Sequence, residues 1–355
     1  MNHLLRIVLT LCALLLSACV NKEIIDDINI ATGMGLDKSE DEIRGTIMIP
    51  VFQPDKSIDN FTFSATGTIP RETIAKMRNK SSQPIVGGSI EVIFFNEELA
   101  RDGIVNLLDL FLRDPSIGAR VYLGVVDGDV KEIFDGDYGD RGNAVYLAGV
   151  IEDGIRGGSL PLTNLRQFLF DYFQKGKDPY LPYLEKTEPD LVELKGLALF
   201  KEDKVVDILS VEQMFYLKLL VDRHHRGGTI AKIGEEAAVF KLLKTKKNFQ
   251  LTNRNPYQFT IDLKLRGIVS EYTGRSLSRK EVNEIEKQLE KQVVTESMKI
   301  IHYNQNLGID PIGFGHFANT KTRGFDFDKW EQQYYPNAEF IINADVTITE
   351  VGMQE

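Results

Sequence analysis

The sequence predicts a multi-domain protein that mixes helices and strands, with a mixed β-α-β sheet in the N-terminal half and an α+β C-terminal half. Three features of the 355 residues lead to this prediction. Apolar and polar residues alternate in several segments, which indicates strands with one buried face. In the first half, a buried strand, an amphipathic helix and a second strand follow one another, which is typical of a parallel or mixed sheet. In the second half, long alternating strands accompany one long helix, which favours an antiparallel sheet with that helix packed on one face.

The first half is expected to follow a short polar lead that ends in Gly33-Met-Gly-Leu-Asp37. Asp114-Pro115 ends the helix of the β-α-β unit, because the residue before a proline is disfavoured in α-helices. The expected elements are a strand over 44–52, a loop over the Asp-, Ser- and Thr-rich residues 53–67, a helix over 68–80 with Ile69, Ile74 and Met77 as its apolar positions, a buried strand over 90–95, a helix over 96–113 and a strand over 119–126.

A cluster of Asp and Gly occupies residues 127–143, and an amphipathic helix is expected over 160–174. Residues 175–189 contain three prolines and many charges, so they are the predicted domain boundary. The predicted organisation is a signal peptide over 1–18, an N-terminal mixed α/β region of two subdomains over 19–190, and a C-terminal α+β domain over 191–355.

The C-terminal domain is expected to contain its longest helix from Ser278 to about residue 304. Ser278 and Glu281 form a capping-box pattern at its start. Val282, Ile285, Leu289 and Val293 recur at helical spacing and form its apolar stripe. The other elements expected here are a hairpin of 194–200 and 205–209, a helix over 210–221 and strands over 259–269 and 339–351.

The first nineteen residues have the layout of an export signal: a basic start, an apolar run from Ile7 to Leu16, and small residues before Cys19. The run is about half the ~20 residues that a bilayer-spanning helix needs, so a permanent transmembrane helix is the weaker interpretation. Leu16-Ser-Ala-Cys19 resembles a lipobox, which predicts that diacylglycerol is attached to Cys19 and that cleavage leaves it as the first residue. The alternative is an ordinary signal peptide with a Cys near its end.

Composition narrows the classes of function. The net charge of −10 argues against a nucleic-acid partner and against electrostatic attachment to anionic lipid. The chain has only two cysteines, Cys12 and Cys19, so the mature chain is predicted to keep one, and that one lipidated. No disulfide, thiol nucleophile or cysteine metal site is therefore expected.

Residues with catalytic or metal-binding potential do not form a recognisable constellation. His224-His225 is most simply a polar helix end that runs into a loop, with a metal role as the alternative. The stretch 127–140 suggests calcium but lacks the spacing and terminal Glu of a calcium-binding loop, so solvated turns are favoured. Trp330 lies among dense aromatic residues that are expected to pack a domain edge, or alternatively to bind a partner. We therefore predict no catalytic residues, no metal and no cofactor, and we assign no ligand-binding residues.

Several stretches, in collinear order over nearly the whole chain, resemble the C subunit of bacterial spore germinant receptors, the Ger(x)C lipoprotein family. They include Lys22-Glu-Ile-Ile25, Gly33–Asp37, the segment Gly88–Asp114 and Leu199-Phe-Lys-Glu-Asp-Lys-Val205. The C-terminal end is the most similar, with Asp310-Pro-Ile-Gly313-Phe314-Gly315, Trp330, Tyr335-Pro336 and then the last strand. The Trp-Asp that often follows the lipidated Cys in the family is replaced here by Val20-Asn21.

The resemblance implies a non-enzymatic lipoprotein on the outer face of the spore inner membrane. It also implies two integral membrane partners, the A-type and B-type subunits, with which the family senses nutrients and starts germination. The resemblance does not assign the nutrient contact to this chain. Two other functions are kept as alternatives: a solute-binding lipoprotein that delivers a ligand to a transporter, and an anchored enzyme.

Overall fold

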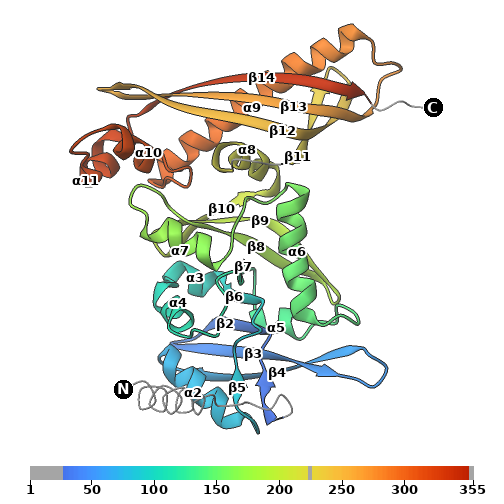
Figure 1. Cartoon of the computed structure of the whole chain (residues 1–355), viewed down its shortest axis with the longest axis vertical. Helices are drawn as coiled ribbons and strands as arrows, with labels where there is room; N and C mark the ends of the chain where they lie inside the picture. The colour runs from blue at the N-terminus through green and yellow to red at the C-terminus, as the bar shows by residue number, and fades with distance from the viewer. Residues whose placement is uncertain (1–26, 223–225, 352–355) are drawn as a thin grey trace, which may run out of the picture.

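The computed structural model describes residues 27–222 and 226–351. Its elements stack along one axis and form an elongated molecule (Figure 1). The described chain begins at the end formed by α2 (Pro70–Lys80), β4 (Ile58–Gly67) and β5 (Ile85–Val86), and a four-stranded sheet forms the opposite end.

An eight-stranded mixed sheet forms the N-terminal part of the molecule, in the order β10-β9-β8-β7-β6-β2-β3-β4. The four central strands, β8, β7, β6 and β2, run parallel to one another, and antiparallel pairs flank them on both sides. The parallel pairing of β6 with β7 confirms the β-α-β prediction. The strands are β2 Gly33–Ser39, β3 Glu42–Phe52, β6 Val92–Asn96, β7 Tyr122–Val126, β8 Tyr180–Glu188, β9 Leu191–Lys201 and β10 Lys204–Ser210.

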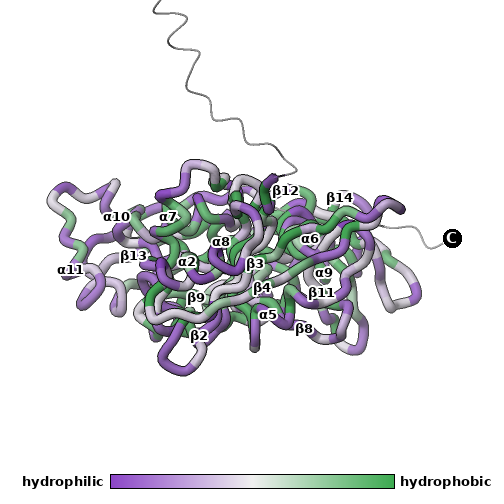
Figure 2. Tube along the Cα trace, turned by 90° about the horizontal axis from the view of Figure 1, so that it is seen from below, coloured by the Kyte–Doolittle hydropathy of each residue, from purple (hydrophilic) through white to green (hydrophobic). Residues whose placement is uncertain are grey.

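Helices cover both faces of this sheet, which explains why β6 is a continuous apolar run. Val92 and Phe94 belong to a core with α5 (Val130–Phe134) and α6 (Asn143–Gly157). Ile93 and Phe95 point to the other face, where they join a second core. That second core contains side chains of α3 (Glu97–Asp102), α4 (Val105–Leu112) and α7 (Leu165–Phe173). Figure 2 looks along the long axis and shows apolar segments among these packed layers and hydrophilic segments in many outer loops.

The second sheet has the order β11-β12-β13-β14. Its first three strands are antiparallel, as predicted, but β13 and β14 run parallel. The long α9 (Arg279–Leu307) connects these two strands, and such a crossover returns the chain in the same direction. The strands are β11 Gly227–Ile233, β12 Glu236–Arg254, β13 Tyr257–Tyr272 and β14 Glu339–Val351, the last with its predicted bounds.

The helix α9 begins after the predicted capping box of Ser278 and Glu281. Ile285, Leu289 and Val293 of its predicted stripe are buried, whereas Val282 is only half-buried. Glu286 and Glu290 of α9 accept hydrogen bonds from backbone N–H groups of β14, so the helix also protects the edge of the sheet. Beside it lie α8 (Val211–Val221), α10 (Phe314–Lys321), the short α11 (Phe327–Lys329) and a π-helical turn over Trp330–Tyr334, while β1 (Asn29–Ile30) pairs with β5.

Two predictions for the first half are wrong. Residues 53–67 are not all loop, because β4 pairs with β3 in antiparallel register and forms an edge of the large sheet. The helix predicted over 96–113 is two helices, broken at Gly103-Ile104. The break depends on a distant residue, since Asp203 Oδ2 accepts a hydrogen bond from the Val105 N–H at 3.1 Å.

Other elements were missed or misplaced. Residues Gly33–Asp37, expected at the end of a polar lead, are part of strand β2, and α6, β11 and β12 were not predicted. Strand β8 occupies most of the Pro- and charge-rich segment 175–189, which was predicted as a domain boundary. The large sheet continues across residue 190, where β8 pairs with β9. Residues 191–210 therefore complete the N-terminal sheet, and the second sheet begins at β11.

Candidate functional site

Cys19, the predicted lipidation site, lies outside the described residues, as do the signal segment 1–18 and His224-His225. The described chain begins at Asp27, eight residues after Cys19. Eight extended residues span at most ~29 Å. If Cys19 carries a membrane anchor, the end of the molecule that contains β1, β5 and α2 is therefore the end close to the membrane. No helix of residues 27–222 and 226–351 is long and apolar enough to cross a bilayer.

An apolar groove of about 650 Å³ lies at this same end, and we refer to it as the N-terminal groove. Ala31, only a few residues after the start of the described chain, is part of its lining. One wall comes from α2, and the opposite wall comes from β5, α4 and the turn that follows α4. Its larger apolar side chains are Met34, Ile47, Ile74, Ile85, Ile90, Leu110, Phe111 and Ile117.

The orientation of α2 follows from how it packs on the sheet. Thr73 and Met77 are buried, and the Thr73 hydroxyl donates to the Ile43 carbonyl oxygen at 3.2 Å. Gly45 makes this approach possible, because a Cβ there would lie 2.8 Å from both Met77 Cε and Thr73 Cγ2. The predicted apolar positions were therefore only partly correct, since Ile69 is 57% exposed and lies at the N-cap.

This packing turns a mixed basic and apolar face of α2 toward the groove. Arg71, Ile74, Ala75 and Arg78 all line it. Arg71 and Arg78 are exposed, and neither guanidinium group forms an ion pair or hydrogen bond within residues 27–222 and 226–351. Arg113 and, more weakly, Arg71 lower the pKa of Asp109. The neighbouring basic residues differ, since Lys76 pairs with Glu72 at 2.8 Å and Arg113 pairs with Asp109 at 2.6 Å. The groove thus offers an apolar floor with two unpaired cations, which suits a partner segment with both apolar and anionic groups.

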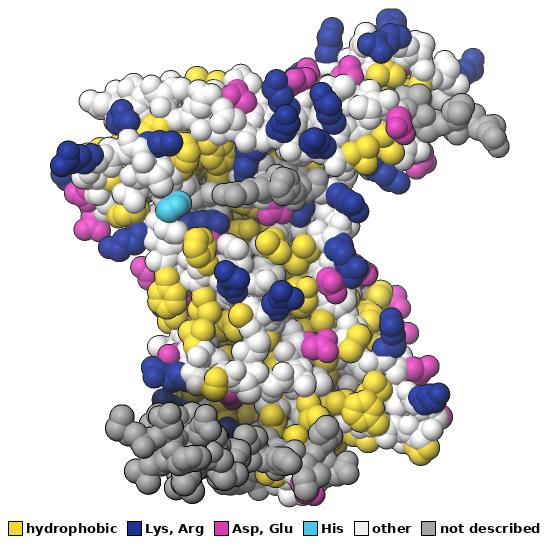
Figure 3. Space-filling view, in the orientation of Figure 1, with side chains coloured by type: hydrophobic (Ala, Val, Ile, Leu, Met, Phe, Trp, Pro, Cys, Tyr) yellow, Lys and Arg dark blue, Asp and Glu magenta, His cyan; other side chains and the backbone are white. Residues whose placement is uncertain are grey.

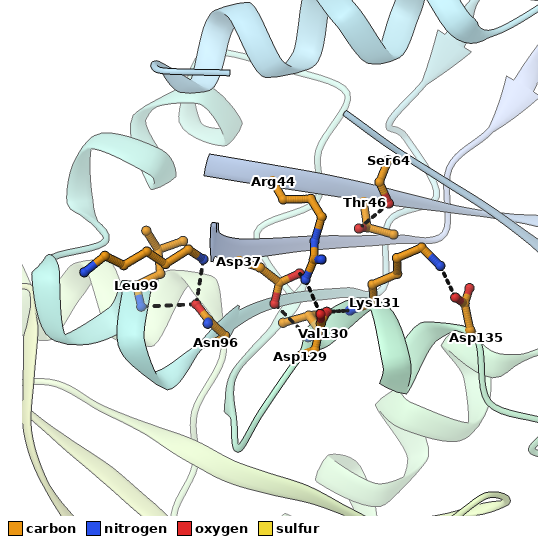
Figure 4. A network of polar contacts seen from close by, with 11 residues as sticks. Asp37, Arg44, Thr46, Ser64, Asn96, Leu99, Asp129, Val130, Lys131 and Asp135 are labelled. Carbon is orange, nitrogen blue, oxygen red and sulfur yellow. Dashed lines mark hydrogen bonds and ion pairs between the residues drawn. The ribbon is translucent and has the colours of Figure 1, made fainter. Parts of the chain in front are cut away.

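A polar network lies at the carboxyl ends of the parallel strands β2, β6 and β7 (Figure 4). Asp37 is 1% exposed, accepts a hydrogen bond from the Val130 N–H at 2.7 Å, and lies 3.2 Å from the Arg44 guanidinium. Arg44 also pairs with Asp129, which caps α5. Burial raises the pKa of Asp37 to about 6, while the Val130 hydrogen bond lowers it.

This network joins two segments that lie far apart in the sequence, Gly33–Asp37 and the Asp/Gly stretch 127–140. Asp135 of the stretch pairs with Lys131 and Thr62. The carboxylates that a calcium site would need are therefore already paired with Arg44, Lys131 and the N-terminus of α5. In residues 27–222 and 226–351, no group of three or more His, Cys, Asp or Glu side chains is arranged to hold a metal ion. We interpret the network as a structural joint between β2 and α5.

Two family profiles match this chain almost end to end. The spore germination protein N-terminal domain matches residues 21–186, and the spore germination B3/GerAC-like C-terminal domain matches residues 195–352. The chain belongs to the spore germination GerAC-like family. The resemblance found in the sequence is therefore confirmed.

Individual relatives agree with this membership. The chain is 28% identical to the spore germination protein GerQC of Bacillus cereus, over 96% of both chains. It is 25% identical to YfkR, a putative spore germination protein of Bacillus subtilis (strain 168), over 97% of this chain and 95% of YfkR. The crystal structure of the GerBC protein has the same fold, with a TM-score of 0.60 and 17% identity over 93% of this chain and 100% of GerBC.

The two family regions meet at a buried polar junction. The Asp310 N–H donates to Asp178 Oδ2 at 2.7 Å, and the Asp178 N–H donates to the Asp310 carbonyl oxygen at 3.0 Å. The Asp310 carboxylate accepts from the N–H groups of Gly313 and Gly315, both at 2.8 Å. Burial raises the pKa of Asp310 to about 7, while backbone hydrogen bonds from Gly315, Phe314 and Gly313 lower it.

Glycines allow the close contact at this junction. A Cβ on Gly176 would lie 2.6 Å from the His316 backbone nitrogen, and one on Gly315 would lie 2.5 Å from Trp330 Nε1. Trp330 is 1% exposed, so it packs a domain edge, which was the first of the two interpretations of the aromatic residues. The Asp310–Gly315 motif, which carried the family resemblance, thus connects the GerAC-like C-terminal region to the N-terminal one.

The N-terminal groove and the Asp37 network were not predicted from the sequence. One sequence feature does point to the groove. Arg71, Ala75 and Arg78 recur at helical spacing and so lie on a single face of the helix. Its opposite wall comes from residues 85–117, whose position depends on the order of the parallel strands. That order cannot be read from local periodicity.

Proposed function

We propose that this chain is a non-enzymatic lipoprotein subunit of a nutrient germinant receptor. In this proposal, Cys19 holds it on the outer face of the spore inner membrane beside integral membrane subunits of the A and B types. The observation that carries the proposal is the match of both germination-family regions, which together cover residues 21–186 and 195–352.

The position of the N-terminal groove supports assembly with membrane-embedded partners. Membrane subunits present their exposed segments close to the bilayer, and the short distance from Cys19 to Asp27 keeps this end of the molecule close to it as well. We propose that the groove takes a juxtamembrane segment of a partner subunit. Apolar side chains of that segment would cover the half-buried Ile74 and Ile117, and its acidic groups would pair with Arg71 and Arg78.

The alternative of a solute-binding lipoprotein receives less support from the architecture. Such proteins enclose their ligand between two similar α/β lobes. Here an eight-stranded mixed sheet is followed by a four-stranded sheet with a different strand order and one long helix. A buried polar junction at Asp178 and Asp310 also connects the two parts.

Co-purification from detergent-solubilised spore membranes tests the proposal. A tagged copy of this chain should recover multi-span membrane subunits in fixed stoichiometry. A tagged, unrelated lipoprotein of the same membrane is the control. Recovery of no multi-span subunit, together with tight binding of a small solute by the purified chain, would favour the solute-binding alternative.

A further inference from the structure

The outer face of the C-terminal sheet carries cations in an arrangement that a sheet does not need for its own stability. The segment 227–272, which spans β11 to β13, contains eight Lys and Arg against four Asp and Glu, in a chain of net charge −10. Figure 3 shows Lys and Arg side chains gathered over this end of the molecule. This excess of positive charge is confined to one segment, so it does not follow from the composition of the chain as a whole.

The strand register places like charges directly opposite one another. Lys244 faces Arg266, and Lys246 faces Lys264, in the antiparallel pairing of β12 with β13. Directly opposed side chains lie about 5 Å apart at Cβ and share one face of the sheet, so like charges there are destabilising. Two adjacent pairs place four cations within about 7 Å along the strands.

The protein does little to neutralise these cations. All four are exposed, and the one ion pair that they form within the described chain joins Lys264 to Asp345 at 3.9 Å, between side chains 67% and 61% exposed. Asp262, which lies on the same face, accepts a hydrogen bond from Asn343 at 2.9 Å. The opposite face of β13 is apolar and buried, with Leu263 and Leu265 at 1% exposure.

We infer that this face, defined by Lys244, Lys246, Lys264 and Arg266, binds a polyanion whose carboxylate or phosphate groups repeat along a chain. An anionic polymer would convert the repulsion between these cations into attraction, with release of the polymer's counterions. Three of the four cations are lysines. Lysine is depleted from protein–protein interfaces, where arginine and aromatic residues are enriched, so a polymer fits this face better than an acidic protein surface.

The location of the face fits the same partner. It lies at the end of the molecule opposite α2 and β5 (Figure 1), which places it away from the proposed membrane anchor. The face therefore points toward anionic polymers outside the membrane rather than toward the anionic lipids of the membrane. Polyanion binding is argued from the charges of this face alone, and only its direction away from the membrane rests on the proposed function.

Retention of the full-length purified lipoprotein on immobilised poly-L-glutamate and on polyphosphate, measured across a salt gradient, tests this inference. Lys246→Gln/Lys264→Gln should weaken binding at least about tenfold and lower the slope of log affinity against log salt by about one for each cation removed. Lys287→Gln/Lys291→Gln removes the same charge from exposed positions of α9 and should leave retention nearly unchanged. Lys246→Gln alone should keep or raise the melting temperature, because it relieves the repulsion from Lys264.

Three outcomes would overturn the inference. The wild-type protein could fail to bind either polymer at low salt, or the α9 control could lose as much affinity as the sheet variant. The third is that the sheet variant keeps its polymer binding but no longer co-purifies with a protein partner, which would assign the face to an acidic protein.

Discussion

Replacing Asp310 with asparagine should remove most of the pH dependence of the protein's stability. The folded-state pKa of this fully buried carboxyl is raised from 3.8 to about 7, so the folded protein holds the proton more tightly than the unfolded chain does. The resulting stabilisation is complete below the unfolded pKa and is lost as the pH rises through about 7. A shift of about three units corresponds to a free energy of the order of 4 kcal/mol.

Asparagine cannot ionise, but it offers one acceptor oxygen, whereas the carboxyl offers Oδ1 to the Gly313 N–H and Oδ2 to the Gly315 N–H. One of these two buried N–H groups therefore loses its acceptor in the variant. The variant should therefore be about 1–3 kcal/mol less stable than the wild type at pH 5, and this deficit should shrink as the pH rises to 8.5. Asp310→Ala removes both acceptors from two buried N–H groups and should cost about 2–6 kcal/mol at pH 5, at ~1–3 kcal/mol for each group.

Urea unfolding of the full-length protein at several pH values, followed by the fluorescence of the single, buried Trp330, measures these differences. Asp37, whose pKa is raised to about 6, and Asp171 and Asp178, whose pKa burial raises, should leave a smaller slope in the variant. A wild-type stability that rises between pH 5 and 8.5, or an Asn variant with the full wild-type slope, would show that Asp310 is ionised in the folded protein throughout this range.

Three further predictions concern the anchor, the packing of α9 on the C-terminal sheet, and metal independence. Cys19→Ala should leave a folded protein that is no longer tightly held on the membrane. Fractionation of cells that lack the proposed partners tests this, and a variant that still sediments with the membrane at high salt would refute the anchor assignment. Leu289 is 1% exposed, so Leu289→Ala should lower the free energy of unfolding by about 2–5 kcal/mol and thereby lower receptor abundance in spores. Normal abundance with a changed nutrient response would instead indicate ligand contact in this domain. EDTA and thiol reagents should leave the melting temperature unchanged, and a loss of several degrees with EDTA would mean that the Asp/Gly stretch 127–140 binds a metal.

The sequence predicted best those elements whose side chains meet solvent on one side and core on the other. The strand Glu339–Val351 and the helix over 279–307 have such a pattern, and both lie close to their predicted positions. The predicted loop 53–67 failed for the opposite reason. Its Asp, Asn, Ser and Thr residues are turn formers, yet at the edge of a sheet the backbone of β4 can still pair with β3.

Tertiary contacts decided the elements that were missed. The helix α6 contains glycines at 149, 154 and 157 that weaken its local signal, but Leu147 and Ile151 are fully buried and hold it against the sheet. For the same reason the sequence could not place the candidate site, because the N-terminal groove combines α2 with residues 85–117, and the Asp178–Asp310 junction spans 132 positions.

The most direct test of the central claim compares two tagged variants in the recovery of multi-span subunits from solubilised spore membranes. Ala75→Trp fills the N-terminal groove from an exposed position of α2, and Val145→Trp adds the same side chain at a 43% exposed position of α6. With both variants lipidated and present at wild-type levels, Ala75→Trp should recover far less of the membrane subunits, while Val145→Trp should recover them as the wild type does. Equal and full recovery by both variants would contradict assembly through the groove, and the absence of multi-span subunits even with the wild type would contradict the receptor role itself.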